Sequence, residues 1–319
     1  MEMIKLQPTC KDYLWGGVRL KEEYNVKTPL DIVAEAWQLS AHKDGPALIA
    51  NGKYQGKNFI EYLQIQGKEC WGSKLQKYDN FPILIKFIDA KQALSIQVHP
   101  NDEYALKHEG EYGKNEMWYI VDCDEDSYIY FGVNKKITKT EYQQHLKAGT
   151  ILEILNKVKV KKGDCFFIKA GTIHAIGEGC LICEIQQNSN STYRIYDFDR
   201  VGVDGKKREL HIDKAIEVSI LEPTASNSTI VNTITDSNYQ ERTLAAGEYF
   251  KAKEYQLQGE LTIEVTKESF VSLIILEGSL VLKHKQQILK LKKGESVFLP
   301  ADLGEIKIEG KAHFIKTNF

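Results

Sequence analysis

The sequence predicts a mainly β protein built from two related barrels with a few helices. In VKVKKGDCFFIKAGTIHAIGEG (158–179), apolar strand-like runs alternate with glycine turns, which is the rhythm of an all-β barrel. From about residue 241 onward, nearly the whole chain has the pattern of short strands and turns. The sequence also contains an internal repeat, because residues 158–174 and LKLKKGESVFLPADLGE (289–305) share K-K-G-[DE] followed by an apolar run. A duplicated small β-barrel leaves such a repeat.

The first half of the chain predicts strands around one helix. Residues 1–45 mix short strand-like runs with turns. In residues 58–77 apolar residues recur at about every third or fourth position, which predicts a helix. Two apolar strands, FPILIKFIDA and LSIQVH, are expected within 81–99, and further strands within 117–133.

The second half predicts one more helix and a linker. TKTEYQQHLKAG (138–149) has a threonine cap at its start and a glycine at its end, and 151–156 could add a helical turn. Residues 225–240 are polar and rich in Ser, Thr and Asn, as linkers are. We therefore expect two domains, 1–238 with the helical segments and 239–319 as a smaller barrel.

Composition excludes several classes of partner. The 319 residues include 42 Lys and Arg and 44 Asp and Glu, a formal net charge of -2. Nucleic acids and acidic membrane surfaces require a basic surplus, so we expect neither as a partner. The N-terminus lacks the apolar core of a signal peptide, and no apolar run is long enough for a membrane span.

The cysteines predict a reduced, cytoplasmic protein. Six cysteines in a chain of this size do not look like a disulfide framework. Cys180 and Cys183 form a C-x-x-C pair, which also occurs in redox and zinc sites. The pair lies in a strand-like run, GCLICEIQQ, where positions i and i+3 face opposite sides, so we expect buried structural cysteines.

Four polar residues at or near the ends of strand-like runs could hold a metal ion: Gln97, His99, Glu116 and His174. Gln97 and His99 are two residues apart, so on a strand they share a face. Two imidazoles, one carboxylate and an amide oxygen suit Zn²⁺ or a similar divalent ion, and a single negative charge leaves the ion Lewis acidic. In the alternative interpretation His99 caps a strand, Glu116 pairs with Lys114 or another base, and His174 fills a turn.

The second copy of the repeat lacks this polar group. Glu305 falls where the first copy has His174, and Val271 falls near the position of Glu116. We therefore expect a second barrel without metal ligands.

A second cluster, NSNSTYRIYDFDR (188–200), places Arg194 among aromatic residues. An arginine near a metal can bind a phosphate bidentately or stabilise an oxyanion. The alternative is a salt bridge from Arg194 to Asp197 or Asp199. Further cations near the candidate metal strands are Lys86, Lys114 and Lys169.

Several motifs together resemble one enzyme family. LSIQVHP, KNEMWYIV, AGTIHAIGEG and STYRIYDFDR occur in the order and context of type I mannose-6-phosphate isomerases (phosphomannose isomerases). DYLWGG, VAEAWQLSAHKDG and FPILIKFIDAKQALSIQVHPND resemble further motifs of that family. The resemblance is strong from about residue 7 to 200 and weaker, but cupin-like, from there to the end. The chain resembles the short bacterial form, which lacks the extra helical domain of longer members.

The resemblance implies a fold and an activity. The fold would be two cupin-type (jelly-roll) β-barrels, with helices packed on the N-terminal barrel. The activity would be a zinc-dependent aldose–ketose isomerisation between mannose 6-phosphate and fructose 6-phosphate through a cis-enediol(ate). The expected partner is a small sugar phosphate, and we expect a monomer or weak homodimer.

The resemblance also implies roles for individual residues. One Zn²⁺ per chain would be held by the four residues named above, Gln97, His99, Glu116 and His174. Arg194 matches the active-site arginine of the family, and would stabilise the enediolate or bind the substrate phosphate. The base that takes the C2 proton would be Lys114, Lys86 in the matching IKFIDA stretch, or a metal-bound hydroxide.

Three other functions remain open at this stage. One is a related metal-dependent isomerase that acts on another sugar phosphate, such as glucose 6-phosphate. A second is a cupin that binds a sugar phosphate without turning it over, which would predict a lost ligand or arginine. A third is an Fe(II) oxygenase, which could use two histidines and one carboxylate but would not account for STYRIYDFDR.

Overall fold

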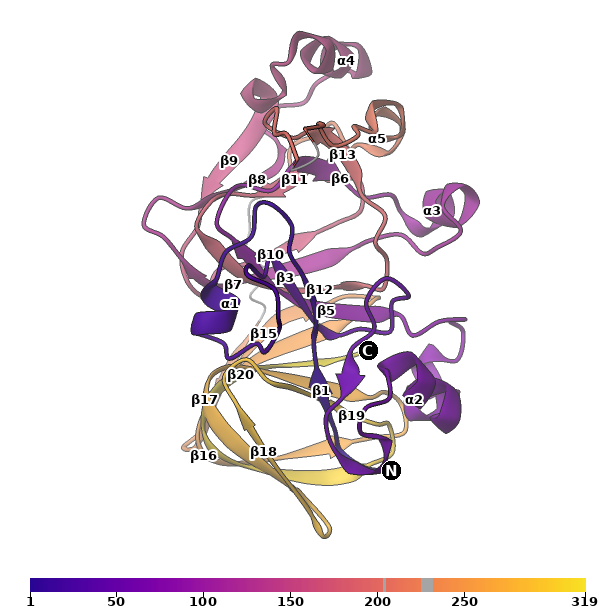
Figure 1. Ribbon diagram of the computed structural model, residues 1–319, viewed down its shortest axis with the longest axis vertical. Coiled ribbons are helices and arrows are strands. Elements are labelled where there is room, and N and C mark those ends of the chain that lie inside the picture. The colour runs from indigo at the N-terminus through magenta and orange to yellow at the C-terminus, as the bar shows by residue number, and fades with distance from the viewer. Residues whose placement is uncertain (203–204, 225–231) are drawn as a thin grey trace. The chain divides into compact units, whose positions relative to one another are not determined.

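The computed structural model describes residues 1–202, 205–224 and 232–319, and these residues are mainly β (Figure 1). The chain divides into two compact units. Within the described residues, unit 1 comprises 1–11, 18–87 and 232–319. Unit 2 comprises 12–17, 88–202 and 205–224.

This grouping differs from the division at residues 238 and 239 that the sequence predicted. The N-terminal strand β1 (Ile4–Gln7) pairs with β19 (Ser296–Leu299) near the other end of the chain, with Ile4 opposite Phe298. Local sequence patterns carry no signal for a pairing between such distant segments. Of the predicted linker, residues 225–231 lie outside the described residues, and 232–240 contain β14 and the start of β15.

Unit 1 is built around a nine-stranded antiparallel sheet in the order β14-β15-β16-β20-β17-β19-β1-β4, with β18 paired to β17. Its strands are β1 (Ile4–Gln7), β4 (Leu48–Ile49), β14 (Thr233–Thr235), β15 (Tyr239–Ala246), β16 (Lys251–Val265), β17 (Val271–His284), β18 (Gln287–Lys292), β19 (Ser296–Leu299) and β20 (Gly304–Asn318). Unit 1 also contains α1 (Arg19–Glu22), the 3₁₀ turn η1 (Gly52–Tyr54), and β2 (Thr9–Lys11) and β3 (Glu35–Leu39), which pair with each other. The strand β5 (Ile83–Ala90) begins in unit 1 and ends in unit 2.

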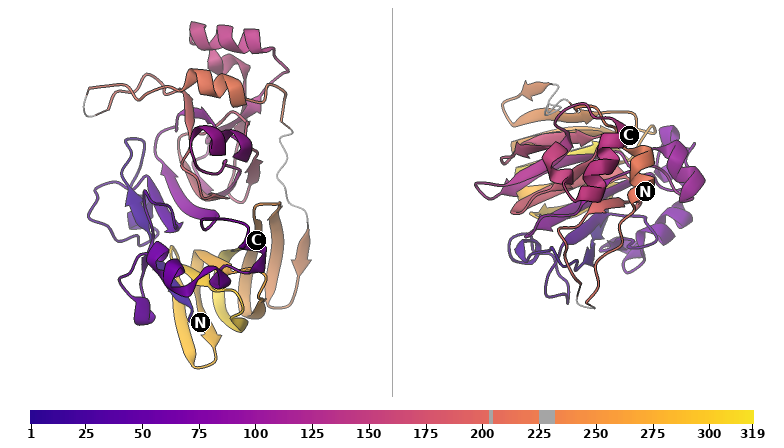
Figure 2. Two further views of the ribbon diagram at one scale, coloured as in Figure 1. Left: turned by 90° about the vertical axis from the view of Figure 1, so that its right-hand side faces the viewer. Right: turned by 90° about the horizontal axis from the view of Figure 1, so that it is seen from above.

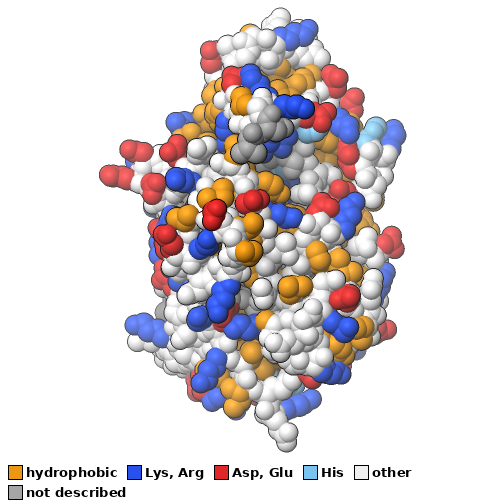
Figure 3. All heavy atoms as spheres, viewed as in Figure 1, with side chains coloured by type: hydrophobic (Ala, Val, Ile, Leu, Met, Phe, Trp, Pro, Cys, Tyr) orange, Lys and Arg blue, Asp and Glu red, His pale blue; other side chains and the backbone are white. Residues whose placement is uncertain are grey.

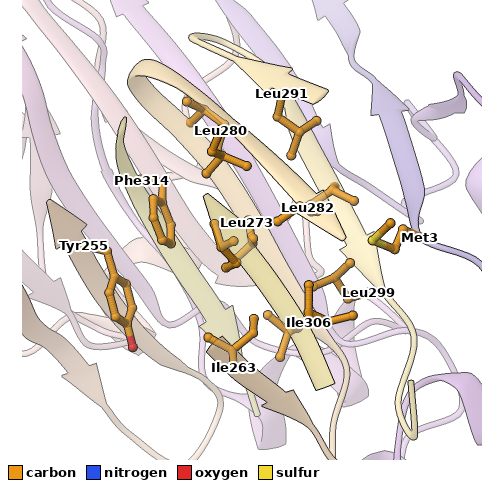
Figure 4. Close-up of a cluster of buried hydrophobic side chains, with 14 of the residues drawn as sticks. Met3, Tyr255, Ile263, Leu273, Leu280, Leu282, Leu291, Leu299, Ile306 and Phe314 are labelled. Carbon is orange, nitrogen blue, oxygen red and sulfur yellow. The ribbon is translucent and has the colours of Figure 1, made fainter. Parts of the chain in front are cut away.

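The apolar core of unit 1 follows the two-residue period of its strands. On β17, Leu273 and Ile275 point inward, and on β20, Ile306 and Ile308 do the same. Figure 4 shows side chains from β16 to β20 converging on one another, together with Met3, which precedes β1. Because these side chains are almost fully withdrawn from water, their burial is the main stabilising term of the unit.

Helix α2 (Phe59–Gln66) confirms the predicted helix over its first half. Asn58 and Glu61 form a capping box at its start, and the helix ends at Gly67, where φ is 76°. The 3₁₀ turns η2 (Lys68–Cys70) and η3 (Ser73–Leu75) follow. Phe59 packs against Phe298 of β19, with ring centroids 5.0 Å apart. This helix therefore packs within unit 1, whereas the sequence had placed it on the N-terminal barrel.

Unit 2 contains two antiparallel sheets. One has the order β13-β6-β11-β8-β9, and the other contains β10-β7-β12 followed by β5. The strands are β6 (Ile96–Val98), β7 (Glu116–Cys123), β8 (Tyr128–Val133), β9 (Leu155–Lys159), β10 (Cys165–Ile168), β11 (His174–Ile176), β12 (Cys180–Gln187) and β13 (Tyr193–Tyr196). The remaining elements are α3 (Asp102–His108), α4 (Lys139–Ala148), α5 (Ile212–Val218) and the 3₁₀ turn η4 (Ile151–Ile154).

Helices α4 and α5 lie on one face of the five-stranded sheet (Figure 2). Tyr142 of α4 and Ala215 of α5 are fully buried against apolar side chains of that face. Helix α4 begins with a capping box between Thr138 and Glu141 and ends at Gly149 in the left-handed conformation. The sequence prediction for this helix is confirmed at both ends.

The internal repeat has the same backbone geometry in both units. The amide of Gly163 donates to the carbonyl of Ile120 at 2.8 Å, and the amide of Gly294 donates to that of Ile275 at 2.9 Å. In each copy the K-K-G turn thus precedes a four-residue strand that pairs with the strand containing the isoleucine. The repeat seen in the sequence is a structural one.

Strand register then shows what replaced the polar residues in the second copy. Glu116 lies opposite Ile168 in unit 2, and Val271 lies opposite Leu299 at the matching place in unit 1. Glu305 is exposed. Among the described residues, a group of His, Cys, Asp or Glu side chains close enough together to hold a metal ion occurs in unit 2 alone.

On the face drawn in Figure 3, acidic and basic side chains are interspersed. Across the residues that the structure describes, no helix has the length and apolarity that a membrane crossing requires.

The duplicated turn predicts a large cost for Gly294→Ala. The residue has φ 84°, and a Cβ atom there would lie 1.9 Å from the carbonyl oxygen of Tyr24. The matched control is Gly304→Ala, where φ is 85° but nothing lies within 4 Å of the added carbon. We expect the free energy of unfolding in urea to fall by about 1 kcal/mol for the control and by about 3 kcal/mol or more for Gly294→Ala. Equal losses would contradict the close approach at this turn.

Candidate metal centre

Three polar side chains share one face of the five-stranded sheet of unit 2. On β6, Ile96 and Val98 pack into the core beneath α4 and α5, so Gln97 between them points to the other face. Gln97 lies opposite His174 of β11 on one side and opposite Arg194 of β13 on the other. Residues directly opposite in antiparallel strands point to the same side. Gln97, His174 and Arg194 therefore form a row across three strands.

Glu116 reaches this face from the other sheet of unit 2. It is the first residue of β7, and His99 directly follows β6. The Oε2 atom of Glu116 lies 3.5 Å from Nε2 of His99, and its Oε1 atom lies 3.3 Å from Nε2 of His174. All three side chains are buried, and their potential ligand atoms lie within 4.8 Å of one another. The structure thus brings together three of the four residues predicted as ligands.

The hydrogen bonds of the two histidines determine which ring nitrogen carries a lone pair. Nδ1 of His99 lies 2.9 Å from the carbonyl oxygen of Ser191, and Nδ1 of His174 lies 2.8 Å from that of Thr172. A carbonyl oxygen can only accept, so each Nδ1 carries the hydrogen and each neutral ring presents an Nε2 lone pair. Burial lowers the pKa of His174 to about 4, so this ring is neutral at pH 7.

This arrangement fits a bound cation. The two Nε2 atoms are 3.1 Å apart, and two lone pairs at that distance repel each other unless a positive charge lies between or beside them. Two neutral imidazoles and a carboxylate are the ligands that a catalytic divalent ion such as Zn²⁺ prefers. The carbonyls that hold each Nδ1–H are the outer contacts that such histidine ligands usually have.

Lys114 supplies one positive charge at the edge of the group. Its Nζ lies 2.8 Å from Oε2 of Glu116 and 3.1 Å from Nε2 of His99. The alternative drawn from the sequence, a Glu116–Lys114 ion pair, is therefore present in the structure. It coexists with the convergence of the histidines, so the two interpretations do not exclude each other.

Arg194 is not engaged as the sequence alternative suggested. Asp197 is paired with Arg200 and Arg208, and Asp199 with Lys207. An Nη1–H of Arg194 donates to the carbonyl of Glu209 at 2.8 Å. Burial and the nearby arginines lower the pKa of Arg194, but an arginine remains charged at neutral pH.

Lys86 lies on β5 within unit 1. It is buried, and its Nζ lies 3.6 Å from Oε2 of Glu35 and 5.0 Å from the ring centroid of Trp37. The indole of Trp37 donates to the same carboxylate at 2.6 Å. Lys169, another lysine that the sequence singled out, directly follows β10 and has an exposed side chain.

Sequence reasoning missed the polar residues that fix the start of β7. Asn115 donates its backbone amide to the side-chain oxygen of Gln187 at 2.9 Å, and its own side-chain oxygen accepts from the amide of Ala170 at 2.9 Å. Gln187 donates in turn to Asp102 at 2.9 Å. The available signal was the run of polar residues, Asn115 before Glu116 and the Gln pair at the end of β12, within otherwise apolar strands.

Known proteins resemble this chain along nearly its whole length. Residues 3–136 match the family model "Phosphomannose isomerase type I, catalytic domain", and residues 240–318 match "Mannose-6-phosphate isomerase, cupin domain". The chain is 39% identical over 318 residues to the mannose-6-phosphate isomerase ManA of Bacillus subtilis, covering 99% of both chains. It is 35% identical over 318 residues to the mannose-6-phosphate isomerase of Streptococcus mutans, covering 99% of this chain and 98% of that one. A crystal structure of the mannose 6-phosphate isomerase from Bacillus subtilis superposes with a TM-score of 0.93 at 36% identity, covering 100% of both chains.

The geometry predicts that His174→Ala abolishes tight binding of a divalent ion, because the group loses one of its two imidazoles and holds zinc far more weakly. After loading with Zn²⁺ and dialysis, the unchanged protein should retain about one ion per chain, as a site of this kind does, and the variant almost none. His145→Ala is the control, since His145 lies in α4 and contacts Thr150. Elemental analysis of the dialysed proteins measures the zinc content per chain. A His174→Ala protein with the full zinc content would contradict the assignment of His174 as a metal ligand.

Proposed function

The chain belongs to the mannose-6-phosphate isomerase family, and we propose that it interconverts mannose 6-phosphate and fructose 6-phosphate at the His99–Glu116–His174 group. The observation that carries this proposal is the convergence of two imidazole Nε2 atoms and a carboxylate in the interior of unit 2. Relatives named for this reaction match the chain along nearly its whole length, which supports the same substrate here.

We propose Zn²⁺ as the ion, one per chain, with Gln97, His99, Glu116 and His174 as its ligands. Support comes from the paired lone pairs of the histidines and from the place of Gln97 opposite His174 in the sheet. When bound, the ion would supply Lewis acidity that polarises the substrate carbonyl and stabilises the enediolate.

The reaction moves one proton between two carbons. A base takes the proton from C2 of mannose 6-phosphate, the bonding pair forms the C1=C2 double bond of a cis-enediol(ate), and the former carbonyl oxygen O1 takes up a proton. A proton is then delivered to C1 while the O2 hydroxyl gives up its proton and becomes the carbonyl of fructose 6-phosphate, so that in net one proton moves from C2 to C1 and one from O2 to O1. A positioned base and a group that stabilises the anionic oxygen are therefore the two requirements on the protein.

We propose Lys114 as the base. It is buried, and its Nζ contacts both Glu116 and His99. These contacts place its amine beside two of the proposed ligands. Lys86 remains a second candidate on the strength of the family resemblance.

Arg194 is the proposed stabiliser of the enediolate. It lies on the same face of the sheet as Gln97 and His174, and its guanidinium keeps donors beyond the bond to Glu209. A planar guanidinium can donate to two neighbouring oxygens, which is the geometry of an enediolate or of a phosphate.

We place the protein in the cytoplasm. None of the six cysteines, all of which lie in the described residues, forms a disulfide, and four of them are buried. Burial raises the pKa of Cys180 to about 12, so this thiol remains protonated and unreactive. The C-x-x-C pair thus has the structural character expected from its strand, and a reducing compartment suits six free thiols.

The first test is a coupled assay of fructose 6-phosphate formed from mannose 6-phosphate. Chelator-treated protein should lose activity by more than about 100-fold, since Lewis-acid stabilisation is worth several kcal/mol. Adding Zn²⁺ should restore it. Zinc-loaded protein that is inactive on mannose 6-phosphate would refute the substrate, and glucose 6-phosphate would be assayed next.

The second test separates the two roles of Arg194. For Arg194→Ala we expect kcat to fall about 100-fold with KM changed by less than about threefold, as for an interaction made mainly in the transition state. Arg194→Lys should recover only part of kcat, because an ammonium lacks the planar pair of donors. A large rise in KM at nearly constant kcat would assign Arg194 to the phosphate instead.

A further inference from the structure

We propose that Asp197 is a positioning residue for Arg194, acting through Arg208. The inference rests on the role proposed above for Arg194. Asp197 lies three residues after Arg194, directly beyond the end of β13, and only 5% of its surface is exposed. Buried carboxylates are rare unless they are paired, so its partners indicate what it does.

Asp197 binds two arginines at once. Arg208 donates from Nε to Oδ2 at 2.7 Å and from Nη2 to Oδ1 at 2.6 Å, a two-pronged contact. Arg200 donates from Nη2 to Oδ1 at 2.5 Å. Burial acts to raise the pKa of Asp197, but the hydrogen bonds from Arg208 and Arg200 outweigh it and lower that pKa. Asp197 is therefore ionised at neutral pH, and its charge is shared between two cations.

The Arg200 contact fixes the turn after β13. Phe198 and Asp199 both have a positive φ, at 54° and 55°, and the amide of Arg200 donates to the carbonyl of Asp197 at 3.1 Å. Positive φ is uncommon for phenylalanine. Arg200 also donates to the carbonyl of Ala93 at 2.6 Å. The turn is thus held from two sides in a conformation that its sequence does not favour.

The contact between Arg208 and Asp197 holds the segment 208–211 next to Arg194. The residue after Arg208 is Glu209, whose carbonyl accepts from the guanidinium of Arg194 at 2.8 Å. Two residues later, the amide of His211 donates to the carbonyl of Arg194 at 2.8 Å, and the amide of Arg194 donates to Nδ1 of His211 at 3.2 Å. Residues 208–211 therefore hold both the backbone and the side chain of Arg194.

The guanidinium of Arg194 is thus held through Nη1, which donates to the carbonyl of Glu209, and its Nε–H remains available as a donor. Nε of Arg194 is buried and has no hydrogen-bond partner among the described residues, so a substrate oxygen could satisfy it. Arg208 and Arg200 are close enough to lower the pKa of Arg194. Asp197 neutralises their repulsion and anchors the segment that orients Arg194.

The experiment is a double-mutant cycle between Asp197→Asn and Arg194→Ala. The amide keeps the size of Asp197 but removes its charge and turns one acceptor into a donor facing arginine. Asp199→Asn is the matched control, because Asp199 lies in the same turn and its pair with Lys207 is exposed, at 71% and 63% of the side chains. Urea unfolding of each variant confirms that it folds; if Asp197→Asn does not fold, Arg208→Lys takes its place in the cycle.

We expect Asp197→Asn to lower kcat about 10-fold to 100-fold, as small misplacements of a catalytic group do, with KM nearly unchanged. Asp199→Asn should match the unchanged protein. In the Arg194→Ala background the same Asp197 substitution should cost less than about twofold, because a residue that acts through Arg194 has nothing left to position. An equal cost in both backgrounds would overturn the proposal, and so would full activity of Asp197→Asn.

A second measurement does not depend on the reaction. Hydrogen exchange of the His211 amide should accelerate in Asp197→Asn and stay unchanged in Asp199→Asn, because residues 208–211 lose their anchor. Unchanged exchange in both variants would refute the positioning role even if the protein proved inactive on mannose 6-phosphate. Inactivity of the unchanged protein would instead count against the proposed function.

Discussion

Two buried imidazoles that turn their lone pairs toward each other and toward a carboxylate form the constraint on which unit 2 depends. Such a group is unfavourable by itself, because it gathers electron density in a place that water does not reach. Lys114 compensates part of it, and the carbonyls of Ser191 and Thr172 fix the rings so that they cannot turn away. The two sheets of unit 2 face each other across this group. The stability that their apolar cores provide is what allows these three side chains to stay in place.

The alternation of side chains along the strands of the five-stranded sheet builds both the apolar core and the polar group. On β6, β11 and β13, every second residue packs beneath α4 and α5, and the residues between them carry the polar chemistry. A shift of one residue in register would exchange the two faces. Apolar packing on one side of the sheet therefore fixes which residues meet on the other, and the site needs no separate device to select them.

Much of this arrangement could be predicted from the sequence. The threonine cap at Thr138 and the repeated K-K-G turn are local patterns with local physical causes, and each has the expected structure. The pairing of β1 with β19 and the packing of Phe59 against Phe298 could not be predicted, because no local pattern records a contact between distant segments. The contact of Arg194 with Glu209 could not be predicted either. Arg194 donates to the backbone carbonyl of Glu209, and since every residue has such a carbonyl, the sequence does not mark which one is used.

The pairing of β1 with β19 also sets the order in which the molecule can be made. A chain that leaves the ribosome N-terminus first exposes β1 long before β19 exists, and the loop that must close between them spans almost the entire polypeptide. Unit 2 lies between these strands in sequence and is nearly continuous, so its contacts become available while synthesis is still in progress. Contacts of high sequence separation slow folding, and unit 1 can complete its sheet only after the last strand has been released. Unit 2, which contains the candidate metal centre, is thus the part of the protein that can fold first, and the sheet of unit 1 is completed only when the two ends of the chain meet.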